Sequence, residues 1–348
     1  IGWCDWSSDV CSSDLLASQA NKNGWSRLRI PQKATGKKVA IVGAGPAGLS
    51  CAARLLEAGH AVTIFDKNTA FGGMVESVIP SDRQSTALAS EVAAVFADVP
   101  KDRMILSLGK ELDCRHNLDT ILAQGFDAAF IGLGLPRSTS VTKKRLLGLW
   151  NAMDFLSQAK RGDGLHLAGK SVAVIGGGNT AMDVAVTAAK AGARDVYVIY
   201  RRSFKEMPAW GVERDRAIAA GVHFQILTQP LDYISRDGKL TGIKLCPTRL
   251  GEPDRSGRRS PQSLESSAYS LDMDVVVEAI GQTTPEGIEK ILPGIEFDHG
   301  LVRTKPGTFA TSRAGVFAGG DLVRGPATVV AAVADGMKAA KEIDRFLQ

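Results

Sequence analysis

Two glycine-rich motifs carry the clearest chemistry in this sequence of 348 residues. The first reads Gly-Ala-Gly-Pro-Ala-Gly and begins at Gly43; the second reads Gly-Gly-Gly-Asn-Thr-Ala and begins at Gly176. Each follows a short apolar run and precedes a helix-like run, the setting in which such glycines bind the diphosphate of a dinucleotide. Two such motifs in one chain predict two dinucleotide cofactors, the arrangement needed to pass a hydride from a nicotinamide to a flavin.

The first motif fits a dinucleotide site at each of its glycines. Gly43 permits the tight strand-to-helix turn, Gly45 lets the backbone approach the diphosphate, and Gly48 lets the helix pack closely on the strand. Asp66 follows the next predicted strand and would accept hydrogen bonds from ribose hydroxyls. A tight turn without a ligand is the alternative, which the matching strand, helix and acid disfavour. The residues predicted to bind this cofactor are Gly43, Ala44, Gly45, Pro46, Ala47, Gly48, Asp66 and Lys67.

The second motif differs from the first in the residues that follow its second strand. Arg201 and Arg202 stand there in place of an acid. A carboxylate would repel a 2′-phosphate, whereas arginine can pair with one, so the sequence predicts NADPH in preference to NADH. In the alternative, one of the two arginines is only a solvated surface residue. The residues predicted from this motif are Gly176, Gly178, Ala181, Arg201 and Arg202.

A third feature lies near the C-terminus, where Gly320 and Asp321 end an apolar run. At the end of a strand, the Asp321 carboxylate could bind hydroxyls of the ribityl chain of a flavin. A following helix, with Thr328 and Val329 at its start, would direct its positive end towards the flavin N1 and O2 atoms and stabilise negative charge there. The alternative is an ordinary strand-to-helix turn with a capped helix.

Both motifs need a strand, a helix and a second strand around them, and the sequence predicts this unit twice. The elements of the two units are a strand over 38–42, a helix over 46–57 and a strand over 61–65, then a strand over 171–175, a helix over 180–190 and a strand over 195–200. The further predicted elements are strands over 128–133 and 274–280 and within 315–321, a helix around 151–160, hairpins over 238–259 and a final helix from about 326.

The composition is that of a globular protein with 44% hydrophobic residues, enough for a large core and two domains. No apolar run approaches the ~18 residues of a membrane span, and the N-terminus lacks a signal peptide pattern, so we expect a cytoplasmic protein without a membrane partner. A net charge of +5 is too small to indicate nucleic-acid binding. Cys51, Cys114 and Cys246 are too scattered for a metal site or a Cys-x-x-Cys pair, so no metal-binding residue is predicted.

Residues 1–15 need separate treatment, because Asp5 to Leu15 look like the translation of a sequencing adapter. We exclude them from the fold as an artefact. Without their three aspartates the net charge rises from +5 to +8. The polar stretch 16–36 is predicted to be a linker into the first strand.

From about Lys33 to Leu347, the chain resembles the flavin- and NADPH-binding module of the glutamate synthase small subunit, which the NADPH-oxidising half of dihydropyrimidine dehydrogenase shares. The segments that carry the resemblance are Val42–Leu49, Phe71–Met74, Val174–Asp183, Tyr200–Ser203, Glu206–Ala209, Ala279–Gln282 and Val316–Asp321.

The resemblance implies an α/β fold of two dinucleotide-binding, Rossmann-like domains, with the NADPH domain inserted into the FAD domain. On this basis residues 37–150 form the first part of the FAD domain, 151–284 the NADPH domain and 285–348 the second part of the FAD domain. By the same likeness Gly72, Gly73 and Met74 lie along the flavin, Asn179 and Thr180 contact the NADPH diphosphate, and Gly134 and Gly281 belong to the sites. Hydride passes directly from NADPH to FAD, so no catalytic side chain is predicted.

The chain departs from the family in three places. The relatives carry an N-terminal domain whose cysteines hold iron–sulfur clusters, and this chain has none before Gly36 outside the excluded stretch. We therefore expect a fragment whose cluster domain is missing; the alternative is a reductase that has no clusters. The loop 79–84 lacks the usual aromatic residue, and Ile131 to Gly134 replace an Ala-Thr-Gly segment.

The leading prediction is an FAD-dependent NADPH oxidoreductase that passes electrons to iron–sulfur clusters or to a partner catalytic subunit. One alternative is the NADPH-oxidising half of a dihydropyrimidine dehydrogenase. The other is a scaffold that binds nucleotides without catalysis.

Overall fold

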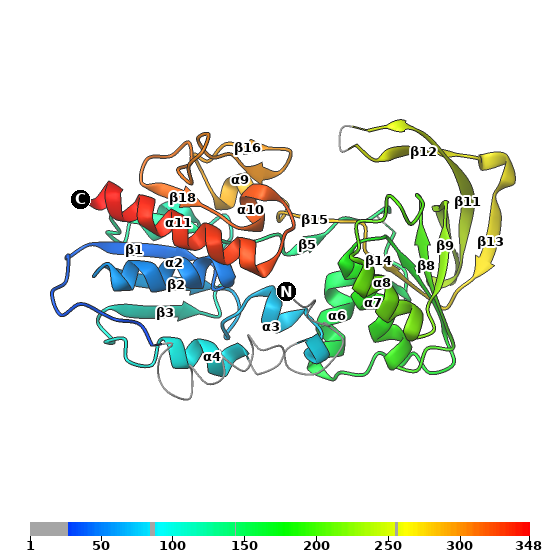
Figure 1. Ribbon diagram of the computed structural model, residues 1–348, viewed down its shortest axis with the longest axis horizontal. Helices are drawn as coiled ribbons and strands as arrows, with labels where there is room; N and C mark the ends of the chain where they lie inside the picture. The colour runs from blue at the N-terminus through cyan, green and yellow to red at the C-terminus, as the bar shows by residue number, and fades with distance from the viewer. Residues whose placement is uncertain (1–26, 84–87, 143, 255–256) are drawn as a thin grey trace, which may run out of the picture. The chain divides into compact units, whose positions relative to one another are not determined.

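The computed structural model describes residues 27–83, 88–142, 144–254 and 257–348, which fall into two compact units (Figure 1). Unit 1 comprises the chain up to Ser77 together with Ser81–Pro136 and Thr284–Gln348, and unit 2 comprises Val78–Pro80 and Arg137–Thr283. Unit 2 is therefore inserted into the sequence of unit 1. The excluded stretch 1–15, residues 16–26 of the predicted linker and Gln84 lie outside the described residues.

Unit 1 is built on a parallel sheet with the strand order β18-β4-β1-β2-β3. Its strands are β1 (Lys38–Val42), β2 (Ala61–Asp66), β3 (Met104–Leu108), β4 (Ala128–Ile131) and β18 (Val316–Ala318). Every residue of β4 and all but the first of β1 are buried, because a parallel sheet is covered on both faces. This explains why these strands are continuous apolar runs in the sequence.

The helices of unit 1 flank this sheet. They are α2 (Pro46–Glu57), α3 (Met74–Ser77), α4 (Leu88–Val95), α5 (Leu118–Leu122), α9 (Ile288–Ile291), α10 (Asp321–Arg324) and α11 (Val329–Leu347), with the 3₁₀ turn η1 (Ser81–Arg83) and a small hairpin of β16 (Phe297–Asp298) and β17 (Leu301–Val302).

The longest of these helices, α11, crosses α2 at very close range. A Cβ built on Gly336 would collide with the Ala47 carbonyl oxygen and the Ser50 hydroxyl. The Ser50 hydroxyl donates to the Val333 carbonyl across the crossing at 3.0 Å. Glycine at position 336 thus lets the last helix rest on the helix that follows the first glycine motif.

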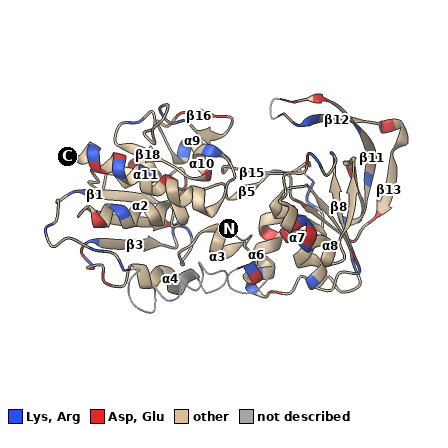
Figure 2. Ribbon diagram, in the orientation of Figure 1, with Lys and Arg blue, Asp and Glu red and all other residues tan. Residues whose placement is uncertain are grey.

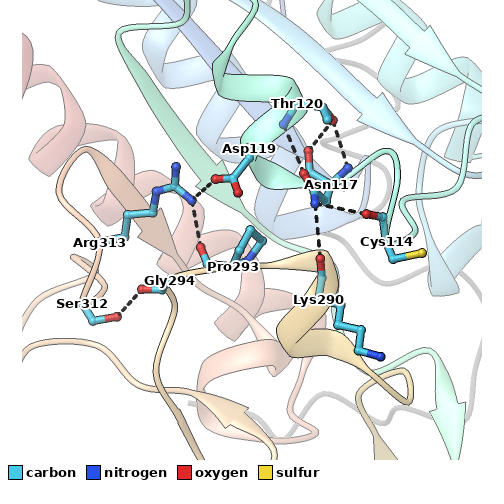
Figure 3. Close-up of polar contacts among 9 residues, drawn as sticks. All are labelled: Cys114, Asn117, Asp119, Thr120, Lys290, Pro293, Gly294, Ser312 and Arg313. Atoms are coloured by element: carbon cyan, nitrogen blue, oxygen red, sulfur yellow. Dashed lines mark hydrogen bonds and ion pairs between the residues drawn. The ribbon is translucent and has the colours of Figure 1, made fainter.

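The chain that returns after unit 2 is tied to α5 by polar contacts (Figure 3). The Arg313 guanidinium donates to the Asp119 carboxylate at 2.6 Å and to the Pro293 carbonyl at 2.8 Å. The Asn117 amide, which caps α5, reaches the Lys290 carbonyl at 3.5 Å. Two segments far apart in sequence are thereby joined into one unit.

Unit 2 repeats the architecture with the parallel order β6-β14-β7-β8-β9. The strands are β6 (Leu149–Asn151), β7 (Ser171–Ile175), β8 (Asp195–Tyr200), β9 (His223–Ile226) and β14 (Val275–Glu278), and the helices are α6 (Ala152–Arg161), α7 (Asn179–Lys190) and α8 (Gly211–Ala219). A second, antiparallel sheet of long hairpins packs its apolar side chains against this one. Its strands are β10 (Thr228–Arg236), β11 (Lys239–Pro253), β12 (Arg259–Ser263) and β13 (Tyr269–Asp272), with the turn η2 (Glu265–Ser267).

Apart from Val78–Pro80, unit 2 begins at Arg137, earlier than the boundary after residue 150 that the sequence suggests. The cause is pairing within unit 2, because β5 (Arg137–Ser138) pairs with β15 (Gln282–Thr283) and β6 pairs with β14. The second boundary, between Thr283 and Thr284, lies one residue before the predicted one.

Candidate functional site

The first glycine motif forms the turn between β1 and α2 in unit 1. Gly43 has a positive φ of 109°, and a Cβ there would collide with the Gly132 carbonyl. A Cβ on Gly48 would collide with the Gly43 carbonyl, whereas one on Gly45 meets no heavy atom within 4 Å. Two glycines are thus needed for packing, and Gly45 leaves open space above the helix N-terminus, where a diphosphate could approach.

Several predicted residues gather around this turn. The Ala44 N–H donates to the Asp66 carboxylate at 2.7 Å, and the Gly72 N–H donates to the Ala44 carbonyl at 2.9 Å. A Cβ on Gly73 would lie 3.0 Å from the Cα of Gly45. Asp66 keeps acceptor capacity for a ribose, because a carboxylate has about four lone-pair sites. Lys67 points to the surface, with its Nζ 3.8 Å from Glu111 Oε1, and Gly134 has a positive φ of 63° just beyond Gly132.

The C-terminal predicted residues lie beside the same turn. A Cβ on Gly320 would lie 3.1 Å from the Cβ of Ala47. The Gly320 N–H donates to the Asp335 carboxylate at 3.0 Å, and Asp335, only 2% exposed, is also paired with Arg324. Asp335 is a residue that sequence reasoning missed, because nothing in the final helix distinguished it from a surface acid.

Asp321 begins the short helix α10, and its carboxylate accepts the Ala327 N–H at 3.2 Å. Burial, reinforced by the nearby Asp335, raises the pKa of Asp321 to about 6, although the Ala327 hydrogen bond and Arg324 oppose the rise. A half-buried acid with unused acceptor capacity is suited to a ligand that brings hydroxyl donors.

Helix α11 begins at Val329, after the position near 326 that the sequence suggests, because the Thr328 side chain caps it by accepting the Ala331 N–H at 3.2 Å. Residues 329–334, its first turns, carry no charge and appear tan in Figure 2. Val329 and Val330 are 42% and 77% exposed. An apolar, exposed helix start fits an aromatic ring system.

The second glycine motif forms the equivalent turn between β7 and α7 in unit 2. Gly176 has a φ of 142°, and a Cβ there would collide with the Ala279 carbonyl. A Cβ on Gly177 would lie 2.5 Å from the Tyr200 ring, whereas one on Gly178 meets nothing within 4 Å. Ala181 is fully buried in the helix. Gly178 is therefore the counterpart of Gly45.

The loop after β8 folds back onto this turn. The Ala209 N–H donates to the Gly177 carbonyl at 3.0 Å, and the Trp210 N–H donates to the Asn179 side-chain oxygen at 3.0 Å. The Tyr200 hydroxyl donates to the Glu206 carbonyl at 2.9 Å. Asn179 thus fixes this loop beside the open space at Gly178, next to Thr180 at the start of α7.

The two predicted arginines have different surroundings. Arg202 is 5% exposed, and its guanidinium donates to the Asp254 carboxylate at 2.6 Å and to the Arg259 carbonyl at 2.7 Å. Arg201 is exposed, and among the described residues its guanidinium has no hydrogen-bond or ion-pair partner. The Arg202 guanidinium is therefore bonded to the hairpin that joins β11 and β12, and a 2′-phosphate site depends on Arg201.

The sequence matches known proteins over most of its length. The profile of the pyridine nucleotide-disulphide oxidoreductase family matches residues 37–336. The glutamate synthase [NADPH] small chain of Escherichia coli (strain K12) is 34% identical over 351 residues, which cover 96% of this chain and 73% of the relative. The chain belongs to this oxidoreductase family. The family, the oxidoreductase class and the FAD and NADPH cofactors predicted from the sequence are thereby confirmed.

Other relatives of this oxidoreductase are longer. The NADP(+)-dependent formate dehydrogenase subunit beta of Moorella thermoacetica is 41% identical over 324 residues, which cover 90% of this chain but only 44% of the relative. Among solved structures, the oxidoreductase FprA of Mycobacterium tuberculosis superposes with a TM-score of 0.73 at 19% identity, covering 90% of this chain and 85% of FprA. This likeness confirms the predicted fold of two Rossmann-like domains.

The oxidoreductase shows neither a membrane-spanning helix nor a metal-binding group of three or more His, Cys, Asp or Glu side chains within the described part of the chain. The donors and spaces that the structure does bring together fit two dinucleotides. Each of the two glycine motifs leaves one open position at the N-terminus of its helix, Gly45 or Gly178. The second strand of unit 1 ends in an acid, and an arginine without a partner among the described residues follows the second strand of unit 2.

Proposed function

We propose that this chain is the NADPH-oxidising module of a larger cytoplasmic enzyme, with FAD bound by unit 1 and NADPH bound by unit 2. The observation that supports this assignment is the contrast between the two glycine turns. Gly45 and Gly178 leave the same open space, but the strand beside the first turn ends in Asp66 and the strand beside the second is followed by Arg201.

In unit 1, the N-terminus of α2 and the backbone at Gly45 would hold the FAD diphosphate, and Asp66 would bind the adenosine ribose. Asp321 would accept hydrogen bonds from the ribityl chain. Gly72, Gly73 and Met74 would lie along the flavin ring, with Thr328 and Val329 at its other side. The exposed apolar start of α11 supports this placement.

In unit 2, the N-terminus of α7, with Gly178, Asn179 and Thr180, would hold the NADPH diphosphate. Arg201 would pair with the 2′-phosphate. Arg202 would act indirectly, since its bonds to Asp254 and to the Arg259 carbonyl hold the β11–β12 hairpin beside Arg201. The preference for NADPH over NADH would then come from one exposed guanidinium.

FAD, when bound, supplies a ring that accepts a hydride from NADPH and can release electrons one at a time. No side chain of the chain needs to act as acid, base or nucleophile in that transfer. The residues of both units contribute by binding and orienting the two ring systems.

The test is anaerobic addition of NADPH to the purified, flavin-loaded protein. We expect the visible absorption band of the oxidised flavin to bleach within about a second, in the usual range of enzyme turnover. NADH at the same concentration should bleach it more slowly. A flavin band that neither nucleotide bleaches would contradict the proposal and favour a non-catalytic scaffold.

The electron acceptor is proposed to be an iron–sulfur domain or a partner catalytic subunit. The names of two relatives, a small chain and a beta subunit, describe parts of larger assemblies, and this chain spans less than half of the Moorella relative. Expression of the complete gene with its neighbours, followed by a search for iron and for a co-purifying subunit, tests this part. A monomeric product without iron would contradict it.

A further inference from the structure

A buried carboxylate in unit 2 has no part in the proposed cofactor contacts. Glu278, the last residue of β14, is 2% exposed. Its Oε1 accepts the Tyr233 hydroxyl at 2.6 Å and the Val141 N–H at 3.0 Å, and its Oε2 accepts the Ser140 hydroxyl. Tyr233 is itself only 3% exposed. Three donors from two other segments thus converge on one side chain.

No cation balances this charge among the described residues, since no Lys, Arg or His side chain contacts Glu278. Burial and the bond to Glu278 raise the pKa of Tyr233 above its usual range, so the tyrosine remains a donor. A buried carboxylate is costly unless its oxygens are fully hydrogen-bonded. Glu278 therefore serves as an acceptor that holds neighbouring segments together.

The position of Glu278 in the sheet gives this network its significance. The strand order β6-β14-β7-β8-β9 reverses between β14 and β7, and dinucleotides bind at the carboxyl ends of strands where the order reverses. Arg201, on the β8 side, would take the adenosine half of NADPH. The nicotinamide half must then extend towards the carboxyl end of β14, where Glu278 lies.

The residues that follow Glu278 are built into the glycine turn. The Ala279 carbonyl fills the space that a Cβ on Gly176 would need. Gly281 has a φ of 145°, and its carbonyl accepts the Thr139 N–H at 3.0 Å. Ile280 lies between them and is 39% exposed. The segment 279–281 is thus held by the same loop, 139–141, that Glu278 fixes from the other side.

We propose that Glu278 is a positioning residue for hydride transfer. It holds the segment 279–281 and the loop 139–141 in the positions that the nicotinamide ring requires. This inference rests on the proposed function. The positioning role is assigned to the length of the Glu278 side chain and to its acceptor oxygens, because each segment is held through a hydrogen bond and not through charge.

Two substitutions of Glu278 separate the effect of its hydrogen bonds from the effect of its charge. In Glu278→Gln the amide oxygen can still accept from Val141 and Tyr233, and the amide NH₂ can donate to the Ser140 hydroxyl oxygen. The single proton of that hydroxyl is then free to bond to the Thr142 carbonyl, which lies 2.8 Å away. In Glu278→Leu a side chain of similar volume makes none of these bonds. Tyr233→Phe removes one donor, and Tyr269→Phe removes a hydroxyl from the exposed strand β13 as a matched control.

The experiment measures two quantities on each flavin-loaded variant of the full chain. The first is the rate of anaerobic flavin reduction by saturating NADPH, and the second is the dissociation constant of 2′,5′-ADP, which carries only the adenosine half of the coenzyme. For Glu278→Leu we expect reduction to slow by about tenfold to a hundredfold, as displaced reacting groups do. We expect its 2′,5′-ADP constant to stay within about twofold. Glu278→Gln should keep most of the rate, Tyr233→Phe should show an intermediate loss, and Tyr269→Phe should match the original protein.

Two results would overturn the inference. An unchanged reduction rate in Glu278→Leu would show that the network does not position the nicotinamide. An equal loss of 2′,5′-ADP binding and reduction would show a general structural role. If Glu278→Leu does not fold, Tyr233→Phe decides, and a normal reduction rate in that variant overturns the proposal. Failure of the original protein to react with NADPH would instead contradict the proposed function itself.

Discussion

Single residues at the carboxyl end of the second strand distinguish the two units. Asp66 ends β2 and accepts a hydrogen bond from the glycine turn, whereas Arg201 follows β8 and is unpaired within the described residues. A carboxylate binds ribose hydroxyls but repels a 2′-phosphate, whereas a guanidinium attracts that phosphate. Cofactor choice in each unit is therefore attributed to one side chain, Asp66 at the end of β2 or Arg201 directly after β8.

Replacing Arg201 tests this attribution. We expect Arg201→Ala to weaken NADPH binding by about tenfold or more, because a hydrogen bond between charged groups contributes roughly 1.5–3 kcal/mol. NADH lacks the 2′-phosphate, so its dissociation constant should change by less than about twofold. Equilibrium titrations with both nucleotides measure the difference. An equal loss for the two nucleotides would show that Arg201 does not bind the 2′-phosphate.

Replacing Arg202 should have the opposite outcome. The substitution Arg202→Ala removes an ion pair to Asp254 and a bond to the Arg259 carbonyl, so we expect it to lower the free energy of unfolding by about 2 kcal/mol. Arg201→Ala, at an exposed position, should change it by less than about 0.5 kcal/mol. Urea denaturation of both variants makes the comparison. A stable Arg202→Ala variant with poor NADPH binding would show instead that Arg202 binds the 2′-phosphate.

The acid Asp321 predicts a pH dependence for FAD binding. Its pKa of about 6 in the folded state lies above the ordinary 3.8, so the folded protein without ligand binds this proton more tightly than the unfolded chain. Stability of the ligand-free protein should therefore fall as pH rises from about 4 to about 6. FAD hydroxyls favour the ionised form, so FAD affinity should rise through the same window and level off above it.

Fluorescence titration with FAD at several pH values tests this dependence. We expect binding at pH 5 to be about tenfold weaker than at pH 7, since one pKa unit corresponds to a factor of ten. Asp321→Asn should bind FAD more weakly at pH 7 and should lose the pH dependence below pH 6. If the FAD affinity of this variant still depends on pH below pH 6, the dependence comes from another group.

At the scale of elements, each glycine turn has positions that must be glycine for packing and one position that leaves open space for the proposed ligand. Gly45 has an ordinary φ of −79° and open space, so Gly45→Ala should fold normally but lose FAD. Gly48→Ala would drive a Cβ into the Gly43 carbonyl and should cost about 3 kcal/mol of stability. Melting temperature and flavin content of the purified variants measure the two effects. The matched control Gly178→Ala should retain flavin, and a flavin-loaded Gly45→Ala would contradict the assignment.

The elements that the sequence predicts well are those with local signals. The strands at 38–42 and 171–175 and the helix at 46–57 have the predicted bounds, because apolar runs, glycine turns and a proline at the helix start define them. The edge strand β3 was missed, since Ile105 and Leu106 are exposed and neighbouring polar residues interrupt the pattern.

The surroundings of single side chains were harder to foresee. Arg201 and Arg202 cannot be told apart in the sequence. Only the folded hairpin, which carries Asp254, pairs with one of them, Arg202. Glu278 reads as an ordinary residue at the end of a strand, because its partners Tyr233 and Ser140 lie far from it in the chain. Contacts that depend on chain segments brought together by folding leave no local pattern.

At the scale of the whole molecule, the order of segments along the chain separates the two binding functions. Unit 2 is inserted after Pro136 and the chain returns at Thr284, so the residues proposed for FAD come from both ends of the sequence. The close crossing of α11 on α2 at Gly336 brings these ends together. The residues proposed for NADPH all come from the inserted segment.

This separation predicts that each cofactor protects its own unit against hydrogen exchange. A ligand at about a hundredfold above its dissociation constant stabilises its site by about 2.7 kcal/mol, which slows exchange through opening of that site by about a hundredfold. FAD should therefore protect peptides around 43–48 and 320–335, and NADP⁺ should protect peptides around 176–181 and 201–210. Mass spectrometry after deuterium labelling, with each ligand alone, measures both patterns. The variants Gly45→Ala and Gly178→Ala should each lose one pattern and keep the other, whereas protection of 176–181 by FAD alone would contradict the assignment of the units.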